Sequence, residues 1–83
     1  MQAYSFYYWV HLQLGHGFSF FGVVDVIFHE ADPEGWWIKG VAAAGEDLPE
    51  YLAESVRGLI EFDKKTRTEI TEKCVREIAK LNG

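Results

Sequence analysis

Two stretches near the start of the chain alternate between apolar and polar residues, which is the pattern of β-strands. From Tyr4 to Leu14 and from Phe18 to Phe28, every even position except Gly22 is apolar or aromatic. Successive side chains of a strand point to opposite faces of a sheet, so the even residues of both stretches share one face. The pattern therefore predicts two long strands with an apolar even face.

The segment Gly15-His16-Gly17 has the composition of the turn that joins these strands into a hairpin. Its glycines accept the positive φ that a bulged three-residue hairpin loop requires. Such a loop sets Leu14 opposite Phe18 and pairs even residues with even residues along both strands. The further even pairs are Leu12 with Phe20, Val10 with Gly22, Tyr8 with Val24 and Phe6 with Val26. A slip of one residue would turn one strand inside out, so turn and pattern support the same register.

The odd face of this hairpin is more aromatic than a solvated surface normally is. Its predicted pairs are Tyr7 with Asp25, Trp9 with Val23, His11 with Phe21, and Gln13 with Ser19. A face this apolar is either covered by another part of the chain or by a second copy, or it binds a different macromolecule. Tryptophan and tyrosine dominate interface hot spots, which is the reason to consider binding.

Residues 29–35 have the composition of a turn, and residues 36–41 predict a short third strand. Trp36 and Ile38 are expected on one side of that strand. Trp37, Lys39 and Val41 are expected on the other side. If this strand pairs with the second strand, Trp37 helps to cover the odd face.

A first helix is predicted from about residue 48 to residue 62. Asp47 suits its N-cap, Pro49 its first turn, and Glu50 completes a capping box. Its predicted apolar stripe consists of Leu48, Leu52, Val56, Leu59 and Ile60. The opposite side carries a row of charges, namely Glu50, Glu54, Arg57 and Glu61.

A second helix is predicted over residues 67–81, with Thr66 and Glu69 as its capping box. Its predicted stripe consists of Ile70, Cys74, Ile78 and Leu81. No Gly or Pro separates the two helices, so one helix over residues 48–81 is an alternative. The polar run over residues 63–68 has nothing to bury, which favours two helices.

These elements predict an α+β fold in a single domain, residues 1–83. A three-stranded antiparallel meander, opened by the long N-terminal hairpin, is followed by two C-terminal helices. If both helices pack on the even face, the odd face is left for a partner.

The composition, 48% hydrophobic and 16% aromatic, is that of a globular chain. Cys74 is the one cysteine, so no intrachain disulfide can form, and a reducing, cytoplasmic location is expected. No basic segment precedes the first apolar run, and Asp25 and the Gly-His-Gly turn interrupt it. We therefore expect neither a signal peptide nor a membrane span.

The net charge of −5 is concentrated in the middle of the chain. Residues 1–28 carry −1, residues 29–62 carry two positive and eight negative charges, and residues 63–83 carry six positive and four negative charges. An acidic balance argues against direct nucleic-acid binding.

Residues that could carry chemistry are few and dispersed. His16 at the turn and His29 at the open end of the hairpin lie about 40 Å apart, so no metal site is predicted from the histidines and Cys74. His11 and Asp25 share the odd face but lie roughly 13 Å apart, beyond the reach of a catalytic pair. Cys74 belongs to an apolar stripe, as a buried thiol does. No catalytic residue and no cofactor is predicted; a small enzyme that uses His11 or Cys74 is the alternative.

The leading functional prediction is a small non-enzymatic module that binds another protein, or itself as a homodimer, through the hairpin. We call the predicted binding surface the aromatic face; it consists of Tyr7, Trp9, His11, Phe21, Val23 and Trp37. In its size, acidity and exposed aromatic content the chain resembles the small inhibitors that phages and mobile elements encode, such as anti-CRISPR proteins. This likeness implies a stoichiometric inhibitor.

A second possibility is an acidic nucleic-acid mimic that presents carboxylates to a basic groove. The residues that would do so, here called the acidic row, are Asp47, Glu50, Glu54 and Glu61.

Overall fold

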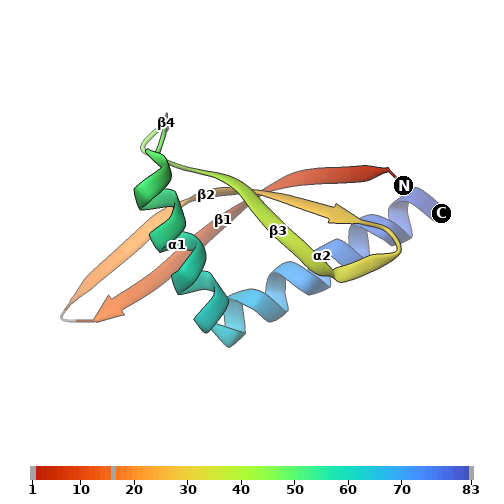
Figure 1. Ribbon diagram of the computed structural model, residues 1–83. Helices are drawn as coiled ribbons and strands as arrows, with labels where there is room; N and C mark the ends of the chain where they lie inside the picture. Colours follow the sequence, from red (N-terminus) through yellow and green to blue (C-terminus); the bar gives the residue numbers. More distant parts are fainter. Residues whose placement is uncertain (1, 16, 83) are drawn as a thin grey trace.

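The computed structural model describes residues 2–15 and 17–82, so the predicted turn residue His16 lies outside the described residues. Figure 1 shows an antiparallel sheet followed by two helices, which confirms the predicted α+β fold. The elements are β1 (Ala3–Gly15), β2 (Phe18–His29), β3 (Asp32–Ala43), β4 (Glu46–Asp47), α1 (Glu50–Phe62) and α2 (Lys64–Asn82). Strand order in the sheet is β1-β2-β3-β4, so β1 forms one edge.

The register of the hairpin is the predicted one along almost its whole length. The even pairs from Phe6 with Val26 to Leu12 with Phe20 are present, and so are the odd pairs from Tyr7 with Asp25 to Gln13 with Ser19. The prediction is wrong at the turn, where Gly15 and not Leu14 pairs with Phe18. A bulge between Gln13 and Gly15 leaves Leu14 as the extra residue of β1, so the turn is shorter than the predicted three-residue loop.

β3 is longer than the predicted third strand and is bulged. Only Glu30 and Ala31 form the turn, because His29 already pairs with Asp32. A bulge places Gly40 opposite Asp25 and Ile38 opposite Val26, which leaves Lys39 as the extra residue. The bulge reverses the alternation, so Val41 is buried on the even face and not on the odd face as predicted.

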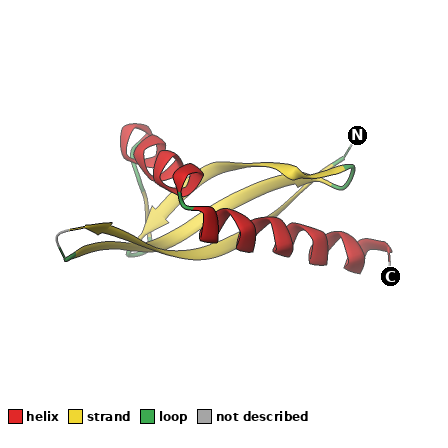
Figure 2. Ribbon diagram, turned by 90° about the horizontal axis from the view of Figure 1, so that it is seen from below, coloured by secondary structure: helices red, strands yellow, loops and turns green. Residues whose placement is uncertain are grey.

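The core lies between the even face and the two helices. Figure 2 shows both helices beside the sheet. The sheet supplies Val24, Val26 and Phe28, which are all almost fully buried, and α2 supplies Ile70 and Cys74. Burying apolar area stabilises the fold by about 25 cal/mol per Å². The even face is therefore the side on which this chain forms its own core.

The buried face of α1 is rotated by about one residue position from the predicted apolar stripe. Its buried residues are Ala53, Val56 and Ile60, while Leu52 and Leu59 are exposed. The small Ala53 side chain lets the helix approach the sheet closely, which a leucine there would prevent. The predicted stripe of α2 ends early as well, because Leu81 is exposed near the end of the chain.

Both predicted capping boxes are wrong. Asp47 belongs to β4, the helix is preceded by Pro49, and no side chain caps α1. The Leu48 N–H donates to the Val41 carbonyl at 2.8 Å, so this segment continues the sheet up to the helix. Tertiary pairing with β3 has overridden the local capping preference.

The two predicted helices are confirmed, but the break is at a single residue. Asp63 has extended backbone angles, φ −97° and ψ 95°, and α2 begins directly after it, ahead of the predicted cap at Thr66. The Thr66 hydroxyl instead donates to the Asp63 carboxylate at 2.7 Å. Asp63 and Thr66 thus hold the sharp corner between the helices.

Candidate functional site: an exposed aromatic face

The aromatic face lies on the side of the sheet away from both helices. Four of its rings remain largely exposed in the folded chain. Their exposed fractions are 74% for Tyr7, 65% for Trp9, 62% for Phe21 and 52% for Trp37. His11 is exposed as well, and Val23 is half-buried. The helices that cover the even residues leave the odd residues bare.

The strand register holds the rings of this face against one another. The Trp9 and Phe21 rings stack with their centroids 5.3 Å apart and their planes 22° from parallel. The edge of His11 meets the Phe21 ring at 5.9 Å. Aromatic pairs of this kind contribute about 0.5–1.5 kcal/mol beyond the area they bury. The rings are thus ordered by a rigid sheet before any partner arrives.

A hollow of about 360 Å³ adjoins the aromatic face beside β3 and β4. The hairpin, β3, β4 and α1 all contribute to its lining, with Tyr7, Val23, Asp25, Gly40, Asp47, Glu50 and Ala53 among the residues. A Cβ at Gly40 would meet no atom within 4 Å, so the absence of a side chain keeps this space open. The hollow is large enough to receive a single side chain from a partner.

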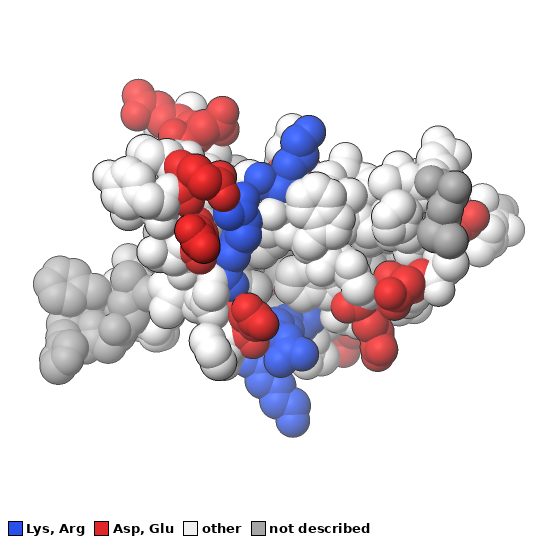
Figure 3. All heavy atoms as spheres, in the orientation of Figure 1, with Lys and Arg blue, Asp and Glu red and all other residues white. Residues whose placement is uncertain are grey.

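Two members of the acidic row, Asp47 and Glu50, line the same hollow as Tyr7 and Val23 of the aromatic face. Figure 3 shows acidic side chains gathered over β4 and the start of α1, with a band of basic side chains next to them. Arg57 interrupts the row, because its guanidinium binds Glu50 at 2.6 Å and donates to the carbonyls of Ile38 and Lys39 at 2.9 and 3.0 Å. The spacing of the charges predicted a row on one side of the helix. It did not predict that Arg57 binds β3 and holds α1 against it.

His11 and Cys74, the residues of the enzyme alternative, lie on opposite sides of the sheet. His11 is on the exposed aromatic face, while Cys74 is fully buried between α2 and the even face. Burial raises the pKa of the Cys74 thiol to about 11, so the thiol stays protonated at neutral pH. A protonated thiol is a poor nucleophile, and the structure does not bring His11 near it.

A groove of about 710 Å³ runs between β1 and the corner where α1 meets α2. β1 contributes residues Tyr8 to Gln13, and the corner contributes Leu59, Phe62 and Thr66 among others. The Tyr8 hydroxyl donates to Glu69 at 3.0 Å across it; burial and then this bond raise the pKa of Tyr8. This groove was not predicted from the sequence, because it depends on where the corner between α1 and α2 lies relative to β1.

Among residues 2–15 and 17–82, no three His, Cys, Asp or Glu side chains gather where they could hold a metal ion. Within the same described part of the chain, neither helix has the length and apolar character needed to cross a membrane.

Comparison of the chain with protein families, curated proteins and solved structures found no match in any of the three.

Proposed function

We propose that this protein is a small non-enzymatic binding module whose aromatic face docks onto another protein. The observation that supports this proposal is the exposure of Tyr7, Trp9, Phe21 and Trp37 together on one side of a rigid sheet. Tryptophan and tyrosine are the residues most enriched at the energetic centres of interfaces. Their pre-ordering in the sheet lowers the entropy that binding must offset.

The size of the exposed patch supports the same proposal. At about 200 Å² per ring, the four rings leave roughly 500 Å² of mainly apolar surface in contact with water. This is at the upper end of the largest patches on monomeric proteins, which are often functional. A standard protein interface buries about 800 Å² on each partner, so the rings and their immediate neighbours make up most of one.

The charge around the aromatic face favours a protein over a nucleic acid as the partner. β1 and β2 contain no Lys or Arg, and Lys39 stands beside the face on the β3 bulge. Surfaces that stack single-stranded nucleic acid combine aromatic rings with a basic groove for the backbone. The rings carry no charge, and the adjoining hollow is lined by three acidic residues and one basic residue, namely Asp25, Asp47, Glu50 and Lys39. This combination instead suits an apolar protein patch that inserts one polar or basic side chain.

In its finer form, the proposal is a cytoplasmic, stoichiometric inhibitor that covers a surface of its target. The single buried thiol is compatible with a reducing compartment. A compact chain with a preformed face can block a site simply by occupying it. Such an inhibitor needs no catalytic group of its own.

A photo-crosslinking experiment in the native cell tests the proposal. A benzophenone amino acid replaces Phe21 on the aromatic face, or Tyr51 on α1, whose side chain is 70% exposed and belongs to neither candidate surface. We expect a discrete crosslinked protein from position 21 that is absent from position 51. Equal crosslinking from both positions, or none from position 21, contradicts the proposal.

A further inference from the structure

The two edges of the sheet are protected to very different degrees. The outer edge of β3 carries Pro33 and the Lys39 bulge, and β4 pairs with its last residues. Arg57 binds the carbonyls of Ile38 and Lys39 along the same edge. Proline, bulges and covering groups are the devices by which proteins prevent an edge from pairing with another strand.

The β1 edge has almost none of these devices. β1 runs for 13 residues with no charged residue and no proline, and its bulge lies at the turn end. A long, flat, apolar edge strand is a template for a further strand, because its outward N–H and C=O groups lack partners in the sheet. The edge is therefore built to accept a strand.

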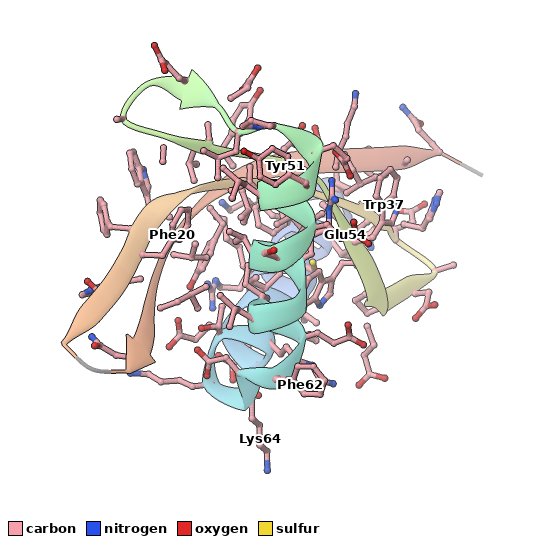
Figure 4. The ribbon with its side chains drawn as sticks, turned by 60° about the vertical axis from the view of Figure 1, so that its left-hand side comes forward. Phe20, Trp37, Tyr51, Glu54, Phe62 and Lys64 are labelled. Carbon is pink, nitrogen blue, oxygen red and sulfur yellow. The ribbon has the colours of Figure 1, made fainter. Side chains whose placement is uncertain are left out.

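Exposed apolar side chains flank the same edge. Phe62, at the end of α1, is 90% exposed and lines the groove beside β1 together with Leu59. Figure 4 shows Phe62 at the foot of α1, close to Lys64 at the start of α2. A phenylalanine side chain that stays in water lacks the stabilisation of about 1.5–3 kcal/mol that full burial would give. A strand added to β1 would lie against this ring.

The two halves of β1 complement each other on the even face. In the half near the turn, Val10 and Leu12 are buried and border the groove. In the half near the N-terminus, Tyr4 and Phe6 are only half-buried. One half of the strand thus offers large rings, and the other half offers a groove.

We propose that the occupant of this edge is a second copy of the chain, whose β1 pairs antiparallel with β1 around a two-fold axis at Tyr8. Tyr8 is the midpoint of the regular part of β1, from Ala3 to Gln13. A two-fold axis that joins two antiparallel edges is perpendicular to the sheet, so the even faces of both copies stay on one side. Residues then oppose one another when their numbers add up to 16.

This register places Tyr4 and Phe6 of each copy at the border of the other copy's groove, while their rings stay in contact with Phe28 of their own chain. Phe6 of the second copy lies opposite Val10, and Tyr4 of the second copy lies opposite Leu12, beside Phe62. The two helix corners do not compete for space, because each lies over residues 8–13 of its own β1 and faces residues 3–8 of the other.

The charges of the chain permit such pairing. β1 is uncharged, whereas acidic residues gather over β4 at the opposite edge of the sheet (Figure 3). The groove beside β1 is lined by charges of both signs, Asp63, Lys65 and Glu69, so no charge of a single sign gathers along the shared edge. Repulsion between charges farther apart than about 10 Å is largely screened at physiological salt.

Pairing would also join the two aromatic faces. Trp9 would lie opposite Tyr7 of the second copy, and the exposed rings of the dimer would present up to roughly 1,000 Å², reduced by the area that Trp9 and Tyr7 bury against each other. This is comparable with the roughly 800 Å² of a standard interface side. This consequence rests on the proposed function, but the edge pairing does not. A dimer with no partner would leave the inference intact and remove the proposed function.

Cysteine crosslinking tests the register. Ser5 and His11 are both exposed and would lie opposite one another across the axis. An equimolar mixture of Ser5→Cys and His11→Cys is expected to form a mixed disulfide under mild oxidation, since opposed strand residues have the Cα separation that disulfides need. Each variant alone places its own two cysteines about 20 Å apart and should not crosslink. The native Cys74 is buried with a raised pKa and does not interfere.

Light scattering tests the dimer itself. The wild-type chain is expected at twice its monomer mass at about 100 µM, as for a dimer of micromolar affinity. Phe62→Ser should weaken dimerisation at least about tenfold. Tyr51→Ser, an exposed ring elsewhere on α1, should leave it unchanged. A monomeric wild type, or no mixed disulfide above the level of the single variants, overturns the inference.

Discussion

Replacing Phe28 with alanine is expected to lower the free energy of unfolding by about 3–5 kcal/mol. The same change at Phe21, on the same strand, is expected to lower it by about 1 kcal/mol or less. Phe28 is almost fully buried and contacts the rings of Tyr4 and Phe6, whereas Phe21 is 62% exposed and loses only its contacts with Trp9 and His11. Urea unfolding followed by circular dichroism measures both values.

Both variants replace a phenylalanine of β2 with alanine, so they differ in the face of the sheet on which that residue lies. A small domain has a total stability of about 5–15 kcal/mol, so the Phe28 variant should lose a large part of its stability. Similar losses at the two positions would mean that both faces of β2 are core. The aromatic face would then have no surface to offer.

The double variant Trp9→Ala, Phe21→Ala is expected to reduce affinity for the partner captured by crosslinking by at least about 100-fold. Two central aromatic hot spots typically contribute 2 kcal/mol or more each when truncated, although such effects are not additive. The stacked pair lies in the middle of the aromatic face, so both rings are expected to contact the partner directly. Isothermal titration calorimetry with the purified partner gives the affinity.

Two comparisons make this result specific. The circular dichroism spectrum of the double variant should stay native, because the even-face core is untouched. Tyr51→Ala, a loss of an exposed ring on α1, should leave the affinity unchanged. Unaltered affinity in the double variant would locate the binding surface elsewhere on the chain.

The parts of the fold that alternate strictly were predictable from the sequence. Period-two alternation in the first 28 residues predicted both strands and the register from Phe6 to Ser19, although the predicted three-residue loop at the turn was wrong. The odd-face rings followed from the same alternation. The polar run around Asp63 also predicted the break between the helices, although by a different cap.

The features that the sequence did not predict depend on tertiary contacts. The bulge at Lys39 reverses the side of the sheet on which Val41 lies. No local sequence pattern at Lys39 predicts this bulge. Asp47 is of a residue type that favours helix N-caps, but its pairing with Ala42 of β3 places it in β4. The position of Phe62 beside the β1 edge depends on the corner angle between the helices. Such features require the packed chain, because propensity is weaker than packing.

The most direct test of the open aromatic face uses the three tryptophan indoles of the free protein as probes. A soluble paramagnetic agent broadens the NMR signals of indole N–H groups that lie near solvent. Trp9 and Trp37 are expected to broaden strongly, while Trp36, whose N–H donates to the Thr71 hydroxyl at 2.8 Å, should be protected. Equal protection of Trp9, Trp37 and Trp36 would show that the chain covers its own aromatic face, and would contradict a binding surface there.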